Sequence, residues 1–170
     1  GLATCGKMPF TNTFAMFASG RAFEQVRNSI AYPRLNVKVV GSHGGLSVGE
    51  DGATHQCIED FGTMSTIPGM MVVNPCDGHE MKLAVKALLG YDGPAYLRLG
   101  RAAVETVTDE IEGYRFELDK GVTLKDGKDV TVIATGLMVQ MALKAREMMA
   151  AEGVSARVID MHTIKPLDGE

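Results

Sequence analysis

Short apolar runs alternate along this chain with stretches of helical periodicity, and this alternation constrains the fold more than any other feature. The runs Val37–Val40, Met70–Val73 and Ala95–Leu99 have the length and composition of buried strands. Strands that alternate with helices are typical of βαβ units, in which parallel strands form a sheet that helices cover. We therefore predict an α/β fold with a parallel sheet flanked by helices.

Three helices are predicted among these strands. The first spans Thr13–Ala31, where apolar residues recur every three to five positions. A short second helix is expected over Gln56–Met64. A third begins at a D-x-x-E capping signal, Asp77 and Glu80, and ends at Gly90.

A polar, aperiodic segment, RAAVETVTDEIEG, follows the last of these strands and has the composition of a linker. We place a domain boundary near Gly113, with one domain over 1–113 and the beginning of a second over 114–170. The second domain is also predicted to be α/β. Its expected elements are a strand over Val130–Thr135, a helix over Leu137–Glu152 with Leu137, Met141, Ala145 and Met148 on one face, and a strand over Val154–Met161.

Composition and charge exclude several classes of protein. The 170 residues are 45% hydrophobic, but no apolar run reaches the roughly 18 residues of a membrane span, so we expect a soluble protein without a membrane partner. The 17 basic residues are scattered and the net charge is −4, which argues against nucleic-acid binding. Three cysteines without a CxxC pair indicate a reducing compartment, and we expect the cytoplasm.

The segment 41–56, GSHGGLSVGEDGATHQ, concentrates the residues that can perform chemistry. It follows a strand at the expected carboxyl edge of the sheet, where ligands of open α/β folds bind. Its five glycines allow the backbone to approach a ligand closely. His43, Glu50, Asp51 and His55 supply two imidazoles and two carboxylates, a set suited to binding a sugar or to general acid and base chemistry.

Other interpretations of these residues stay open at this point. The glycine-rich segment is also typical of a mobile surface loop. Phe14 and Phe17, three positions apart, have the spacing of an ordinary core helix. A zinc site is a further alternative, although its ligand spacing lacks a matching second pair. Its ligands would be drawn from His43, His55, Cys57, Cys76 and His79.

Three segments together resemble the pyrimidine-binding domain of transketolases: PFTNTFAMFASGRAFEQVRN, GSHGGLSVGEDGATHQ and IPGMMVVNPCDGHE. A fourth, VTVIATGLMVQMALKAREMMAAEGVSARVIDMHTIKPLD, is similar to the start of the transketolase C-terminal domain, so the resemblance covers nearly the whole chain. It is strongest to transketolases made as two separate polypeptides. The resemblance implies a thiamine diphosphate-dependent enzyme that transfers a two-carbon ketol unit from a ketose phosphate to an aldose phosphate.

The resemblance also implies roles for six residues. Phe14 and Phe17 match aromatic residues that flank the aminopyrimidine ring of the cofactor. His55 matches a catalytic histidine that hydrogen-bonds the two-carbon donor unit. The substrate-binding positions are His43, Asp51 and Arg101, of which Arg101 matches a phosphate-binding arginine.

Further parts of such an enzyme are implied outside these residues. In the family, the diphosphate and its divalent metal, Mg or Ca, bind a separate domain with a GDG motif, which this sequence lacks. The glutamate that protonates the aminopyrimidine precedes a segment like GLATCGK, with which this chain opens. We therefore expect the chain to be inactive alone and to act on sugar phosphates with a diphosphate-binding domain or subunit, as a homodimer or heterotetramer.

Two alternatives to transketolase remain. The first, 1-deoxy-D-xylulose-5-phosphate synthase, shares the fold, the cofactor and a helix similar to RAFEQVRN, but SHGGLSVGEDG favours transketolase because the loop of the synthase is shorter and lacks a counterpart of His43. The second is a non-catalytic homologue kept for assembly or regulation.

Overall fold

The computed structural model describes residues 1–169, which divide into two compact units that interleave along the chain. The first unit comprises Gly1–Val73, Leu88–Ala102 and Ile164–Pro166, and the second comprises the segments between and after them. Each unit is built on a sheet of its own.

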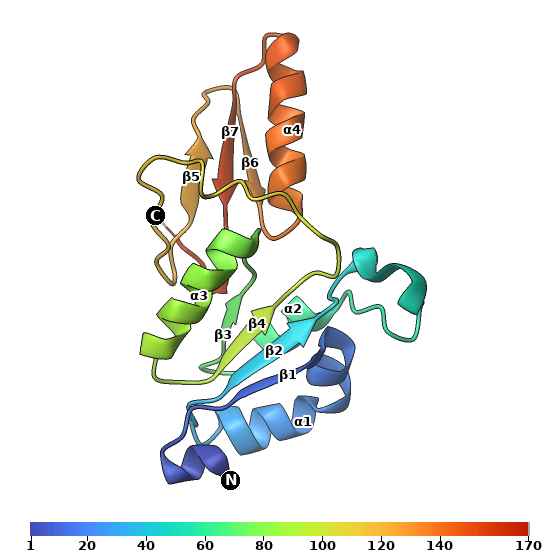
Figure 1. Ribbon diagram of the computed structural model, residues 1–170, viewed down its shortest axis with the longest axis vertical. Coiled ribbons are helices and arrows are strands. Elements are labelled where there is room, and N and C mark those ends of the chain that lie inside the picture. The colour runs from blue at the N-terminus through green and yellow to red at the C-terminus, as the bar shows by residue number, and fades with distance from the viewer. Residues whose placement is uncertain (170) are drawn as a thin grey trace. The chain divides into compact units, whose positions relative to one another are not determined.

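The sheet of the first unit has the strand order β1-β2-β4-β3-β8. The first four of these strands pair in parallel, and Figure 1 shows the arrows of β1, β2 and β4 pointing the same way. The α/β fold with a parallel sheet is thereby confirmed. The strands are β1 (Phe10–Phe14), β2 (Lys38–Ser42), β3 (Met71–Val73), β4 (Ala95–Arg98) and β8 (Thr163–Lys165).

The segment after β1 is helical, but it begins later than the sequence predicts. Residues 10–14 form β1 and pair with the whole of β2, from Phe10 opposite Lys38 to Phe14 opposite Ser42. Phenylalanine and threonine, four of these five residues, suit a strand, and backbone pairing with β2 outweighs the helical spacing that continues from residue 15 onward. The helical elements that follow are η2 (Phe17–Arg21), α1 (Phe23–Gln25) and η3 (Val26–Ala31).

The core of the first unit lies between these helical turns, the sheet and α2 (Asp60–Ser65). It contains Val26, Met64, Val72 and Tyr96, each at most 4% exposed. Helix α2 begins four residues after the expected start. Two short helical turns complete this unit, η1 (Leu2–Cys5) and η4 (Leu46–Asp51).

The second unit contains a three-stranded sheet of order β5-β7-β6. β6 (Val130–Ala134) pairs in parallel with β7 (Ala156–Asp160), and β5 (Val122–Lys125), which the sequence pattern does not predict, pairs antiparallel with β7. Helix α4 (Met138–Ala151) lies alongside β6 and β7 (Figure 1).

The expected apolar face of α4 is not the buried one. Met141 and Met148 are exposed, whereas Val139 and Ala142 are buried. Val139 packs with Cys76 and Leu124, so contacts between segments far apart in sequence select this face.

Helix α3 (Gly78–Gly90) confirms the predicted capping signal. The Glu80 backbone N–H donates to Asp77 Oδ1 at 2.8 Å. The Glu80 carboxylate accepts the backbone N–H of Cys76 at 2.6 Å, one residue before the position of a standard capping box. Within residues 1–169, none of the helices has the length and apolar character needed to span a bilayer.

Candidate functional site

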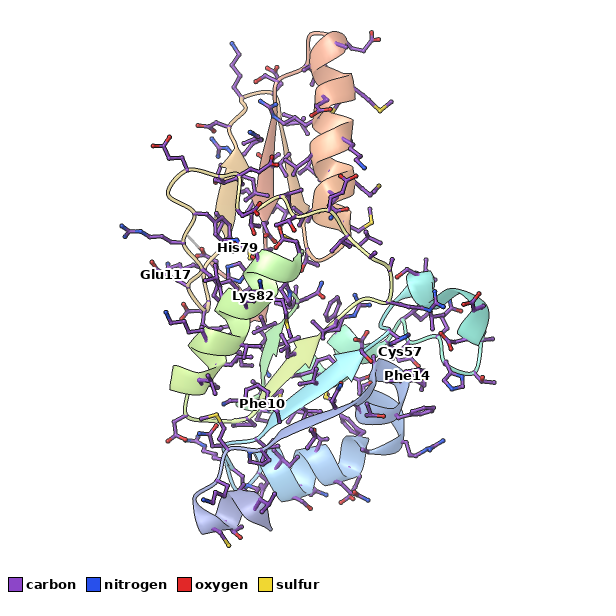
Figure 2. The ribbon with its side chains drawn as sticks, viewed as in Figure 1. Phe10, Phe14, Cys57, His79, Lys82 and Glu117 are labelled. Carbon is purple, nitrogen blue, oxygen red and sulfur yellow. The ribbon has the colours of Figure 1, made fainter. Side chains whose placement is uncertain are left out.

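Four partly exposed rings gather where β1 and β2 end, and we call them the ring cluster: Phe14, Phe17, His43 and His55. Phe14 is the last residue of β1 rather than a helical residue, and His43 directly follows β2. Figure 2 shows Phe14 at the carboxyl end of β1 and Phe10 at the other end. The cluster therefore lies at the sheet edge that open α/β folds use for ligands.

The two phenylalanine rings are nearly parallel, with an interplanar angle of 2° and centroids 5.9 Å apart. The His43 ring stacks on Phe14 at 4.2 Å. His55 meets both phenylalanines edge-on, at 5.3 Å from Phe14 and 5.2 Å from Phe17. The Arg21 guanidinium lies over the Phe17 ring at 4.5 Å.

Local backbone and hydroxyl contacts orient both histidines. His43 adopts a left-handed conformation with φ of 61°, and its Nδ1 lies 3.0 Å from the hydroxyl of Ser42. His55 Nδ1 lies 2.9 Å from the hydroxyl of Thr54. Because Nδ1 is engaged in each ring, Nε2 is the nitrogen that can meet a ligand.

These side chains fit a flat heteroaromatic ring such as an aminopyrimidine. Phe14 and Phe17 offer parallel faces for stacking, and His43 and His55 bring polar nitrogens beside those faces. Arg21 is the arginine beside the ring cluster, and no group of three metal-binding side chains forms there within the part of the chain that the structure describes. The residues present therefore fit the ring of thiamine diphosphate and not its diphosphate.

The glycine-rich segment is closed at its base by backbone hydrogen bonds. The Gly44 N–H donates to the Leu99 carbonyl at 3.0 Å, and the Gly45 N–H donates to the Cys57 carbonyl at 2.7 Å. A Cβ at Gly44 would lie 2.1 Å from Arg98 Nε, so a larger residue there would displace the Arg98 side chain. Figure 1 shows η4 projecting beyond the carboxyl end of β2.

A buried polar network beneath this segment was not found from the sequence. The Asp60 carboxylate, 1% exposed, accepts the Tyr96 hydroxyl at 2.9 Å and pairs with Arg98 Nε at 3.2 Å. Burial, and then the neighbouring Asp60 charge, raise the pKa of Tyr96, so its hydroxyl stays a donor. The Arg98 guanidinium also lies over the Phe61 ring at 4.7 Å. No local motif signals a network whose members are 36 and 38 positions apart.

Asp51 and Arg101 contact each other. Arg101 Nη2 lies 2.5 Å from Glu50 Oε1, and its Nε lies 3.2 Å from Asp51 Oδ2. All three side chains are partly or largely exposed. The predicted site residues thus form two groups, the ring cluster and this ion-paired group, both in the first unit.

The zinc site considered from the sequence does not form within residues 1–169. The Cys57 thiol lies 3.3 Å from the hydroxyl of Ser19, and His79 Nδ1 lies 2.8 Å from the hydroxyl of Thr108. The one group with metal-binding spacing in this part of the chain is a different set, Cys76, Glu80 and Asp160.

Comparison with known proteins identifies the family of the chain. Residues 1–106 match the family model of the transketolase pyrimidine-binding domain, and residues 119–170 match that of the transketolase C-terminal domain. A putative transketolase C-terminal section of Methanocaldococcus jannaschii is 48% identical over all of this chain and 54% of the relative. A 6-deoxy-6-sulfo-D-fructose transketolase subunit of a Clostridium species is 45% identical over all of this chain and 52% of the relative.

A more distant relative is 1-deoxy-D-xylulose-5-phosphate synthase of Pelotomaculum thermopropionicum, 35% identical over all of this chain and 26% of that enzyme. Among solved structures, a split-gene transketolase described as an inactive β4 tetramer superposes with a TM-score of 0.88 and 48% identity, over 98% of this chain and 53% of that one. This chain thus spans about half the length of the first curated relatives it matches. With both family models matching in order along the sequence, the chain belongs to the transketolase family.

Proposed function

We propose that this chain supplies the pyrimidine side of a thiamine diphosphate-dependent active site that moves a two-carbon ketol unit from a ketose phosphate to an aldose phosphate. The observation that carries the proposal is the ring cluster at the carboxyl ends of β1 and β2, where two parallel phenylalanine rings lie beside two oriented histidines. Membership of the transketolase family supports both the cofactor and the transferase role.

Within this proposal the ring cluster binds the aminopyrimidine ring of the cofactor and orients the substrate. Phe14 and Phe17 stack on the aminopyrimidine ring and exclude water from it. When bound, thiamine diphosphate supplies the carbon nucleophile and the electron sink for breaking a carbon–carbon bond next to a carbonyl. His55 donates from Nε2 to the substrate oxygen on which negative charge develops, and His43 hydrogen-bonds a neighbouring hydroxyl.

The ion-paired group, Glu50, Asp51 and Arg101, binds the phosphate end of the substrate. Exposed ion pairs contribute only about 0–1 kcal/mol, so a substrate phosphate displaces Glu50 and Asp51 from Arg101 at little cost. Displacement frees the Asp51 carboxylate to accept a sugar hydroxyl. Phosphate binding at Arg101 and hydroxyl binding at Asp51 are therefore coupled.

The remaining parts of the site are proposed to come from a partner. The related split-gene protein is described as an inactive β4 tetramer, which supports the need for a second kind of subunit or domain. We propose that this partner binds the diphosphate through Mg or Ca, and that the complete enzyme is a dimer or heterotetramer in the cytoplasm. All three cysteines lie among the described residues and are free thiols, consistent with a reducing compartment.

One observation favours transketolase over 1-deoxy-D-xylulose-5-phosphate synthase. His43 stacks on Phe14 as a full member of the ring cluster. A shorter loop without this histidine, as expected for the synthase, would leave the Phe14 face uncovered. A non-catalytic homologue would keep the rings for cofactor binding or assembly and show no turnover.

The test is a coupled ketol-transfer assay on the chain assembled with its diphosphate-binding partner, using xylulose phosphate as donor, with and without thiamine diphosphate. We expect transfer that requires the cofactor and the partner. Transfer without the cofactor would refute the proposal. Formation of 1-deoxy-D-xylulose 5-phosphate in the same mixture would favour the synthase, and cofactor binding without any turnover would favour the non-catalytic homologue.

A further inference from the structure

A fully buried group of metal-binding side chains lies in the second unit, and we call it the Cys76 cluster: Cys76, Glu80 and Asp160. Cys76 precedes α3, Glu80 lies in its first turn, and Asp160 is the last residue of β7. The Cys76 thiol and one oxygen of each carboxylate all lie within 4.8 Å of one another. Cys76 is 2% exposed, and the two acids are 0% exposed.

The carboxylates of Glu80 and Asp160 differ in the hydrogen bonds that they accept. Glu80 accepts the backbone N–H of Cys76 at 2.6 Å and the hydroxyl of Tyr114. Asp160 accepts no hydrogen bond from an N–H or hydroxyl group of residues 1–169, and its polar neighbours are the Glu80 carboxylate and the Cys76 thiol. No lysine, arginine or histidine of this part of the chain forms an ion pair with either acid.

Negative charge also surrounds the cluster. The neighbouring Asp77 carboxylate accepts hydrogen bonds from the backbone N–H groups of Glu80, Val107 and Thr108. Burying unpaired carboxylates costs several kcal/mol per ion, because nothing replaces the water that they lose. Such a group needs either protons or a cation.

A proton would reduce the charge of the two carboxylates without completing the hydrogen bonds of Asp160. A proton between Asp160 and Glu80 would join the two carboxyl groups, but it would leave the second Asp160 oxygen without a donor from residues 1–169. A divalent cation would neutralise the charge and coordinate these oxygens at the same time.

We propose that Cys76, Glu80 and Asp160 bind a divalent transition-metal cation, for which Zn²⁺ is the best match. A thiolate is a poor ligand for Mg²⁺ or Ca²⁺ and a good one for Zn²⁺, which also accepts carboxylate oxygens. Zn–S and Zn–O bonds of about 2.3 and 2.1 Å place tetrahedral ligands roughly 3.4–3.7 Å apart, so ligand atoms within 4.8 Å need to close by about 1 Å. The ion joins the start of α3 to the end of β7 and acts as a structural clamp.

Because the cluster is buried, the cation must be supplied while the chain folds. The full chain is refolded with Zn²⁺ or with EDTA, passed over a desalting column, and assayed for bound zinc and for its melting temperature. Co²⁺ replaces Zn²⁺ in a parallel sample, because a thiolate–Co²⁺ bond produces a charge-transfer absorption band. Cys76→Ser and Asp160→Asn each remove one ligand, and Cys57→Ser is the control because it alters a buried thiol of the other unit.

We expect about one zinc ion per chain, a melting temperature that falls in EDTA, and a thiolate–Co²⁺ band. Cys76→Ser and Asp160→Asn should weaken zinc binding at least about tenfold, and Cys57→Ser should leave it unchanged. Proton release should accompany zinc uptake, because the Cys76 thiol must become a thiolate to bind the ion. Failure of the wild-type chain to retain zinc, or equal retention by wild type and Cys76→Ser, would overturn the proposal. If Asp160→Asn does not fold, the Co²⁺ band in folded Cys76→Ser decides the question.

Discussion

Replacing His55 by alanine should lower kcat far more than it lowers the unfolding free energy. In the folded chain His55 makes two edge-on ring contacts, with Phe14 and Phe17, and one contact with an exposed hydroxyl. Aromatic pairs contribute about 0.5–1.5 kcal/mol each, and partial exposure places the loss for His55→Ala at about 1–2 kcal/mol of unfolding free energy. Loss of a donor to an oxygen that becomes charged in the transition state lowers kcat by about 10²–10³, or roughly 2.7–4 kcal/mol.

The matched control is His79→Ala. His79 is also partly buried, with its ring 6.0 Å from Tyr114 and its Nδ1 2.8 Å from the hydroxyl of Thr108, so its removal should cost a similar unfolding free energy. It lies outside both groups of the candidate site. Urea unfolding of each variant gives the stability change, and steady-state ketol transfer with the assembled partner gives kcat and KM. Equal losses of kcat in His55→Ala and His79→Ala, or an unchanged kcat in His55→Ala, would refute the assigned role.

Three further predictions follow from other contacts. Arg101→Ala should raise KM for phosphorylated substrates by about 10–100-fold, measured by steady-state kinetics, while the unfolding free energy changes by less than about 0.5 kcal/mol because its ion pairs are exposed. Gly41→Ala should destabilise the chain by about 1–3 kcal/mol in urea unfolding, because the new Cβ would lie 2.4 Å from the hydroxyl of the fully buried Tyr96. Gly62→Ala, whose Cβ would have no neighbouring atom within 4 Å, should instead stabilise helix α2 by about 0.5–1 kcal/mol. Burial lowers the pKa of Lys38 to about 8. Between about pH 8 and 9.5 the unfolded chain therefore holds more protons at this position than the folded chain, and the unfolding free energy should rise with pH. Lys38→Met should remove this contribution, and the same pH dependence of unfolding in both proteins would contradict it.

The strands and helices that a local pattern specifies were predictable. β2, β3 and β4 each contain a short, largely apolar run, and the start of α3 follows from Asp77 and Glu80. β1 was missed because the phenylalanines of FTNTF also fit the spacing of the helix that follows, and only pairing with β2 distinguishes the two. β5 and β8 are short, with 4 and 3 residues, and depend on a neighbouring strand in the same way.

The candidate site was predictable in its residues and not in its contacts. Phe14, Phe17, His43 and His55 were identified from the glycine-rich segment and the resemblance to transketolases, and the structure brings their rings together. That Asp51 pairs with Arg101 does not follow from the sequence, since the two lie in segments about fifty residues apart.

The contacts between buried polar side chains could not be predicted from the sequence. Asp60 contacts Tyr96 across 36 positions, and Cys76 lies near Asp160, the last residue of β7, although the two are far apart in sequence. No spacing rule connects such residues, because their proximity is a property of the completed sheets.

The stacking of Phe14 on the aminopyrimidine ring is the central claim, and the affinity for thiamine diphosphate tests it most directly. Isothermal titration of the chain assembled with its diphosphate-binding partner would compare wild type, Phe14→Ala and Phe10→Ala, which remove the same side chain from opposite ends of β1 (Figure 2). Loss of one stacking face, worth about 1–2 kcal/mol, should raise Kd for Phe14→Ala about tenfold. Phe10→Ala should stay within about twofold of wild type, since Phe10 lies outside the ring cluster. An unchanged Kd in Phe14→Ala, or an equal loss in both variants, would contradict the assignment of the ring cluster to the cofactor.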